Sequence, residues 1–177
     1  MLFSVEDRTF HLQNLASLTD EVERANKLEN LNAITEFSLQ HTKCRHKMIL
    51  QYFGEDISEC EENCDVCRNP KRVNPNNMIE EAKIVLQCFK EMKRLSSKVT
   101  SRSLQLTLLG SNSSEIQVNG FCRCNSLGAG KKFTTGAKDR KLTVQRLILT
   151  LILKKILIEQ FKQGNNQSIH RSKKLEI

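Results

Sequence analysis

The chain has 177 residues, 38% of them hydrophobic but only 5% aromatic, and it contains no Trp. That is enough apolar material for a packed core. No uncharged apolar stretch reaches the roughly 18 residues of a membrane helix, so we expect no membrane partner. The net charge of +8 hides an asymmetry: residues 1–70 carry 7 Lys and Arg against 13 Asp and Glu, and residues 71–177 carry 21 against 7. The split predicts two units, the second of which meets a polyanion. A merely solubilising surface is the alternative.

The seven cysteines bear on the compartment. The first seven residues have neither the basic start nor the apolar run of a secretory signal. An odd number of cysteines in such a chain favours a reducing compartment and a metal site over a disulfide framework. Cys88 lies on the apolar stripe of a predicted helix and is expected in the core, whereas Cys122 and Cys124 are interpreted as loop residues.

The first elements in chain order are helical. Residues 1–4 are a short apolar fragment typical of the end of a strand. From 5 to 54 the apolar residues recur at helical spacing, and Gly54 is a helix stop. Residues 55–67 are acidic, rich in cysteine and irregular. Both prolines fall in residues 70–77, which are predicted to be a linker.

The second unit combines helices with a terminal hairpin. We predict a helix over 78–95, short helices and a long loop over 96–140, and a strongly apolar helix over 139–157. Two extended segments, 158–163 and 168–177, then flank a Gly-Asn-Asn-Gln turn. Helices followed by a hairpin are the layout of a winged helix, in which one helix meets DNA and the hairpin lies alongside.

Four cysteines have the spacing of metal ligands, with 15, three and two residues between them: Cys44, Cys60, Cys64 and Cys67. Four thiolates form the closed tetrahedral set of a structural Zn²⁺, which leaves no open position for chemistry. The ion would supply much of the local folding energy, on the order of 10 kcal/mol. Alternatives are buried cysteines, a Cys64–Cys67 redox pair, or His41 or His46 in place of one thiolate.

Around these cysteines the sequence resembles the zinc-binding segment of RecQ-family DNA helicases. The resemblance rests on residues 44–55, which end in Tyr-Phe-Gly-Glu, followed by Cys60 and by Cys64-Asp65-Val66-Cys67. It is strong over 44–67, fair over 139–169 and weak over 96–138. It implies a mainly α fold with four parts: a remnant of the second motor lobe (1–4), a helical Cys₄ zinc-binding subdomain (5–69), a linker (70–77) and a winged-helix DNA-binding domain (78–177).

In that family these parts accompany an ATP-driven motor that unwinds DNA in the 3′-to-5′ direction. The phosphate loop of such a motor is absent from this sequence. Residues 128–132, Gly-Ala-Gly-Lys-Lys, have the wrong spacing and no preceding apolar strand. We therefore expect an accessory region without enzymatic activity of its own, with ATP and Mg²⁺ bound only in the absent motor lobes.

A cluster of basic and hydroxyl residues precedes and opens the apolar helix, and we predict that it contacts DNA phosphates without reading sequence. The predicted contacts are Lys131, Lys132, Thr135, Lys138, Arg140, Lys141 and Arg146. A solvated loop is the alternative. The hairpin would add Lys162, Asn165, Asn166, His170 and Arg171. In some family members an aromatic at the hairpin tip acts as a wedge, and this tip has none.

The resemblance implies duplex, forked or junction DNA as the partner, with repair, recombination or replication proteins as further partners. It also implies a monomer located in the nucleus, or in the nucleoid if the source is bacterial. Two other functions remain open. A stand-alone zinc and winged-helix transcription regulator would bind a specific sequence, and a protein-interaction module would bind a partner protein instead of DNA.

Overall fold

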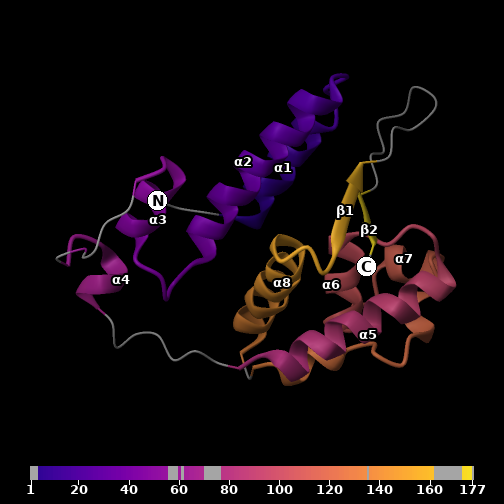
Figure 1. The fold of residues 1–177 in the computed structure, drawn as a ribbon. Helices are drawn as coiled ribbons and strands as arrows, with labels where there is room; N and C mark the ends of the chain where they lie inside the picture. Colours follow the sequence, from indigo (N-terminus) through magenta and orange to yellow (C-terminus); the bar gives the residue numbers. More distant parts are fainter. Residues whose placement is uncertain are drawn as a thin grey trace. The chain divides into compact units, whose positions relative to one another are not determined.

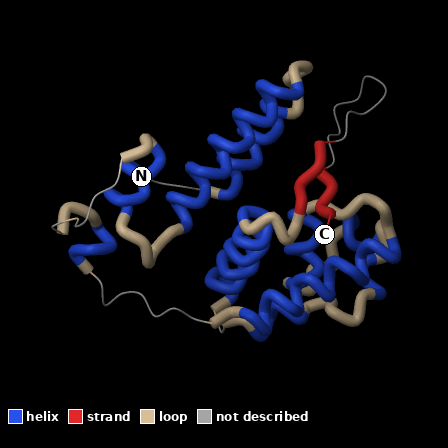
Figure 2. Tube along the Cα trace, in the orientation of Figure 1, coloured by secondary structure: helices blue, strands red, loops and turns tan. Residues whose placement is uncertain are grey.

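In a computed structural model the chain is described at residues 4–55, 60, 62–69, 77–134, 136–161 and 173–176. It divides into two compact units, residues 1–77 and 78–177. Both units consist mostly of helices, and the strands lie in the second unit (Figures 1 and 2). Within the described residues no helix is long and apolar enough to cross a membrane.

The first unit begins with a helical hairpin made of α1 (Val5–Leu15) and α2 (Glu21–Leu39). Ser4 starts α1 through a capping box in which its hydroxyl accepts the Asp7 N–H at 3.0 Å. Asp20 starts α2 by accepting two N–H groups of the first turn. Caps of this kind satisfy donors that would otherwise lack a partner, so the sequence locally determines where both helices begin.

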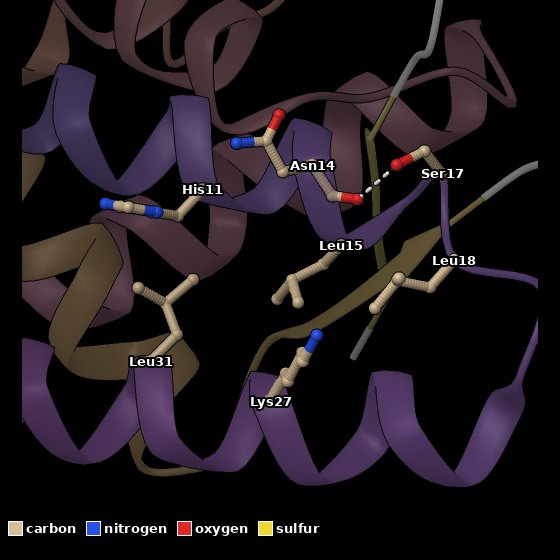
Figure 3. A pocket seen from close by; sticks show the side chains of 7 residues that line it. All are labelled: His11, Asn14, Leu15, Ser17, Leu18, Lys27 and Leu31. Carbon is tan, nitrogen blue, oxygen red and sulfur yellow. Dashed lines mark hydrogen bonds between the residues drawn. The ribbon is translucent and has the colours of Figure 1, made fainter.

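The core of this first unit is small. Among its described residues the buried apolar side chains are Leu12, Leu15 and Cys64. A recess of about 480 Å³ lies between the hairpin helices, with Leu15 and Leu31 on its opposite walls (Figure 3). Val22 is 70% exposed although periodicity predicts an apolar stripe there. A unit with so little buried apolar surface needs a further source of stability.

Two shorter helices complete the first unit, α3 (Arg45–Tyr52) and α4 (Asp65–Arg68). α3 ends at the Phe53–Gly54 turn, where Gly54 has a φ of +82°. That conformation is open to glycine at little cost, so the predicted helix stop is confirmed. α4 was not predicted, because one turn of helix leaves no periodicity in the sequence.

In the part of the second unit that the structure describes, six helical elements pack around one core. They are α5 (Ile79–Leu95), α6 (Ser101–Leu108), α7 (Ser114–Val118), η2 (Phe121–Arg123), η3 (Ala129–Lys132) and α8 (Ala137–Leu153). Its fully buried side chains include Val85, Cys88, Phe89 and Met92 of α5, Leu104 and Leu108 of α6, Ile116 of α7, Phe121 of η2 and Val144 of α8. The core position predicted for Cys88 is confirmed, and Cys124 is also buried.

The chain ends in a two-stranded antiparallel sheet, β1 (Ile158–Phe161) and β2 (Lys173–Glu176), in which Ile158 pairs with Glu176 and Phe161 with Lys173. The predicted hairpin turn lies outside the described residues. α8 ends at Leu153, four residues before the predicted end, because the backbone turns at Lys155, where φ is +57°. The turn lets Leu157 enter the core, where it is fully buried.

Candidate functional site

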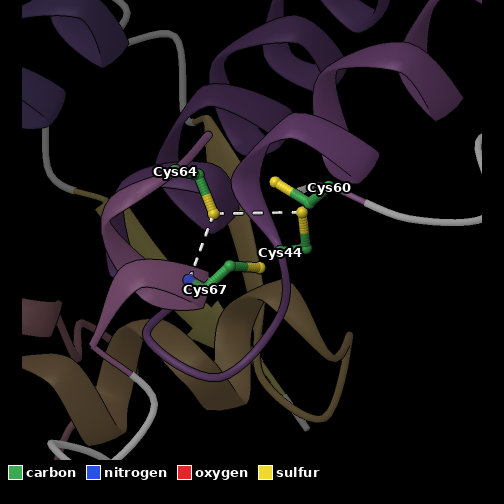
Figure 4. Close-up of side chains that lie close together, drawn as sticks. All are labelled: Cys44, Cys60, Cys64 and Cys67. Carbon is green, nitrogen blue, oxygen red and sulfur yellow. Dashed lines mark hydrogen bonds between the residues drawn. The ribbon is translucent and has the colours of Figure 1, made fainter. Parts of the chain in front are cut away.

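The four cysteines predicted as ligands come together in the first unit (Figure 4). Their sulfur atoms all lie within 4.8 Å of one another, and the Sγ atoms of Cys44 and Cys64 are 3.9 Å apart. Tetrahedral Zn²⁺ with bonds of about 2.3 Å places its sulfurs about 3.8 Å apart. The arrangement therefore fits one zinc ion with four thiolate ligands.

Two of these cysteines are also the N-caps of the short helices. Cys44 precedes α3 and its sulfur accepts the Lys47 N–H at 3.3 Å, while Cys64 precedes α4 and accepts the Cys67 N–H at 3.4 Å. Helix N-termini favour negative charge. Both helices therefore present backbone donors to sulfurs that would be thiolates when a metal is bound.

The pKa values of Cys60, Cys64 and Cys67 differ widely without a metal. Burial raises the pKa of Cys64, but the N–H groups of Cys67 and Arg45 outweigh it and lower the value to about 6. Hydrogen bonding to Cys64 and then to Cys44 raises the pKa of Cys67 to about 12. Contact with Cys44 followed by burial raises the pKa of Cys60. The cluster cannot hold four thiolates by itself, and a divalent cation is the charge that allows it.

Arg45 joins this cluster to the preceding helix. Its Nη1 donates to the carbonyl oxygen of Phe37 at 2.6 Å, and its guanidinium lies 5.1 Å from the centre of the Phe37 ring. Cation–π contact and a charged hydrogen bond both favour this position. Arg45 thereby holds the end of α2 against the start of α3.

Within the described residues the cluster contains neither His41 nor His46. The Tyr-Phe-Gly-Glu motif lies beside it, where Tyr52 and Phe53 are 60% and 72% exposed and their rings meet edge to face at 5.3 Å. Both line an apolar groove of about 700 Å³ between α2 and α3. The conspicuous aromatic motif is therefore a surface feature and does not belong to the metal shell.

Several of the predicted DNA contacts share one face of α8. Lys138, Lys141 and Arg146 are exposed, and at 100° per residue they fall within one arc of the helix. The opposite face carries the buried Val144 and Leu147. Burial of the apolar side of α8 in the core therefore leaves these three cations facing solvent.

Arg140 lies on the other side of this helix. It is half-buried and its Nε donates to the Gly136 carbonyl at 3.3 Å, so the structure separates it from Lys138 and Lys141. The Asp139 carboxylate lies 2.6 Å from where a Cβ on Gly136 would be. The start of α8 therefore already has a carboxylate beside it. A DNA phosphate bound there would need the lysines to offset repulsion from that carboxylate.

Lys131 and Lys132 are exposed in η3. The Nζ of Lys131 lies 2.9 Å from where a Cβ on Gly110 would be, so this side chain crosses the turn after α6. Three residues after Gly110, the buried Ser113 hydroxyl has no hydrogen-bond partner among the described residues. The sequence analysis did not include this turn among the predicted contacts. Its Gly-Ser-Asn-Ser-Ser run, residues 110–114, could have indicated a turn rich in hydrogen-bonding groups.

The remaining predicted contacts lie outside the described residues. They are Thr135 before α8 and the hairpin residues Lys162, Asn165, Asn166, His170 and Arg171. They stay predictions from the sequence.

Comparison with known proteins agrees with the cysteine geometry. The model of the RecQ zinc-binding family matches residues 6–68, which include α1 to α4 and all four cysteines. The chain carries a RecQ zinc-binding domain. The resemblance to the RecQ family drawn from the sequence is confirmed by this match and by relatives that cover most of the chain.

Three similar proteins are helicases by name. ATP-dependent DNA helicase hus2/rqh1 of Schizosaccharomyces pombe is 30% identical over 143 residues, 79% of this chain and 10% of that protein. ATP-dependent helicase SGS1 of Saccharomyces cerevisiae is 27% identical over 162 residues, 88% of this chain and 11% of its own length. ATP-dependent DNA helicase Q-like 2 of Arabidopsis thaliana is 25% identical over 140 residues, which are 76% of this chain and 16% of that protein. The RecQ-related chain therefore spans between a tenth and a sixth of each relative.

Proposed function

We propose that this chain is the zinc-stabilised DNA-binding region of a RecQ-type 3′-to-5′ helicase, which holds duplex or forked DNA by its phosphates and assists strand separation. The observation that carries the proposal is the exposed cationic face of α8 in a chain with a RecQ zinc-binding domain. Lys and Arg that neutralise phosphates release counterions, so the affinity falls with salt and carries little sequence information. That behaviour suits an enzyme that meets any sequence.

The zinc ion has a structural part in this proposal. Cys44, Cys60, Cys64 and Cys67 hold it in a closed shell, so it bonds no substrate. The small core of the first unit supports this part, because a unit that buries few apolar side chains gains most from a metal crosslink. When bound, the ion would supply folding free energy and fix α3 and α4 relative to each other.

The second unit is proposed to be a winged helix. Three features support it: α6 followed by the turn at Gly110, the long α8 whose exposed face is basic, and the antiparallel β1–β2 pair after it. In this interpretation α8 meets the DNA and the hairpin lies beside it. The Lys131 ammonium near Gly110 supplies a further donor for a phosphate.

The test is DNA binding by the full chain, measured as fluorescence anisotropy of a labelled forked duplex. We expect micromolar affinity that weakens steeply with salt. Combined Lys138→Ala, Lys141→Ala and Arg146→Ala should lower the slope of log affinity against log salt by about 2–3, whereas Lys154→Ala at the other end of α8 should not. Unchanged binding by the triple variant would reject the α8 face as the DNA site.

The same assay separates the competing functions. A transcription regulator would discriminate one duplex sequence from another, and a protein-interaction module would bind no DNA even at low salt. Equal affinity for unrelated sequences is the result that the helicase proposal requires. We place the protein in the nucleus, because the relatives are helicases of eukaryotes. We also propose that it is a monomer.

A further inference from the structure

A second cationic surface lies on α5, apart from the predicted DNA contacts. Lys83, Gln87, Lys90 and Arg94 are all exposed, and their spacing of three to four residues places them on one stripe of the helix. The stripe continues past the end of the helix to the exposed Lys98. We name Lys90, Arg94 and Lys98 the α5 stripe.

Acidic residues do not neutralise the α5 stripe. Between Glu81 and Glu115 the sequence has six Lys and Arg but one acid, Glu91. The carboxylate of Glu91 is occupied by other donors, because it accepts the Ser126 N–H at 3.0 Å and the Gln87 amide at 2.9 Å. Lys83 has its own partner, Glu80, at 2.7 Å. Among the described residues no carboxylate pairs with the three side chains of the stripe.

Helix capping does not explain this charge. Cations near a helix C-terminus interact favourably with its dipole, but only within the last turn. That accounts for Lys93 and Arg94. Lys90 lies before the last turn of α5 and Lys98 lies beyond the helix. Three cations within nine residues repel one another, and an anion bound there would relieve that repulsion.

The stripe is remote from the basic face of α8 within the same unit. The first turn of α8 lies toward the beginning of α5, whereas the stripe lies at its end (Figure 1). An α-helix of 17 residues is about 25 Å long. The two surfaces therefore lie toward opposite ends of a helix of that length.

We propose that the α5 stripe binds a second segment of DNA, so that this unit bridges two arms of a branched molecule. This inference rests on the proposed function of α8. Lys90 and Arg94 are separated by about 6 Å along the helix axis. Along one DNA strand, two nucleotide steps rise by roughly 6.8 Å, so the two cations match the spacing of every second phosphate. No exposed aromatic side chain interrupts the stripe, so it contacts phosphates and not bases.

The test compares a labelled four-way DNA junction with a linear duplex of 15 base pairs or so. In the full chain, combined Lys90→Ala, Arg94→Ala and Lys98→Ala should weaken junction binding about tenfold and lower its salt slope by about 2–3. Binding of the short duplex should change less than twofold. Lys83→Ala is the matched control, because it lies on the same stripe but is already paired, and it should alter neither.

A second variant adds charge without removing any contact. Ser97 is exposed between Arg94 and Lys98, so Ser97→Glu should weaken junction binding in the same direction while the melting temperature is unchanged. Unchanged junction binding by both variants overturns the proposal. An equal loss for duplex and junction also overturns it, since the two surfaces would then form one site.

Two further outcomes separate this proposal from other interpretations. If the unaltered chain binds neither DNA, the proposed function itself fails. If DNA binding is unchanged but the triple variant loses binding to poly-glutamate, the stripe is a surface for an acidic protein, and the second DNA segment is rejected.

Discussion

The Nε of Arg45 lies 2.7 Å from Oδ1 of Asp65. These residues directly follow Cys44 and Cys64, so the ion pair joins the two segments that place cysteines in the cluster. Arg45 is the more enclosed partner, with 20% of its side chain exposed against 65% for Asp65. Because Arg45 also binds the Phe37 carbonyl, one side chain connects α2, α3 and α4.

Arg45→Ala is expected to destabilise the first unit by about 1–2 kcal/mol, because it removes a charged hydrogen bond and a cation–π contact together with a partly screened ion pair. Urea unfolding with zinc bound measures this. Arg45→Lys should recover little, since an ammonium cannot reproduce the guanidinium fork. Lys27→Ala, which removes an exposed ion pair with Glu23 at 2.7 Å, is the control and should change stability by less than about 0.5 kcal/mol. Equal effects of the two alanine variants would contradict a bracing role for Arg45.

Cys64→Ser should abolish stoichiometric zinc and lower the yield of soluble protein. Cys64 is the buried member of the cluster, so its loss leaves an incomplete shell around an acidic segment. Metal analysis of purified protein should return about one zinc per chain before the change and much less after it. Cys122→Ser is the control, because Cys122 is exposed and outside the cluster.

Zinc affinity should fall as the pH falls. The pKa of Cys67 is raised to about 12 by its hydrogen bonds to Cys64 and Cys44, and that of Cys60 is raised by Cys44. Both thiols are protonated at neutral pH without metal, so zinc must displace at least two protons to bind. Two displaced protons predict about a hundredfold change in apparent affinity per pH unit. Competition with a chromophoric chelator between pH 6 and 8 measures this, and a flat profile would contradict protonated thiols.

Glu91→Gln should remove a stabilising contact that depends on pH. Burial raises the pKa of Glu91, but donors from Gln87 and Ser126 outweigh it and lower the value. A carboxyl whose pKa is lower in the folded protein than in the unfolded chain stabilises the fold when it is ionised. This stabilisation is complete above the pKa of the unfolded chain, about 4.3, and is lost as the pH falls through the pKa in the folded protein. The two proteins should therefore differ by about 1 kcal/mol at pH 7 and converge below pH 4. Thermal melting across this range is the measurement, and a constant difference would rule out the carboxylate as its source.

Gly130→Ala should destabilise the second unit by about 1–3 kcal/mol, because its Cβ would lie 3.0 Å from the Leu108 carbonyl oxygen and 3.1 Å from Val144. Both atoms belong to packed helices that cannot move freely. Gly136→Ala is the control, since its close neighbour is the end of the flexible Asp139 side chain. Similar melting temperatures for the two variants would show that η3 is not packed as tightly as described.

Some features were predictable because their causes are local. The Cys₄ set follows from residue type and spacing, and the helices around Leu12, Phe89 and Ile148 follow from their periodicity. Val22 was misjudged, and Arg140 lies apart from the other predicted contacts on α8, for one shared reason. Periodicity tells which residues share a face of a helix, but not which face meets a neighbour.

By itself the sequence determined the metal chemistry, the charge division between the two parts of the chain and the resemblance to RecQ helicases. Only the tertiary structure decided that Arg45 braces the cysteines and that Arg140 turns from the basic face of α8. It also decided that Lys90 and Arg94 have no acidic partner among the described residues. These relationships join residues from different helices or depend on which side of a helix is buried. Packing selects them, because each helix must bury its apolar side against the others before its charged residues take their final positions.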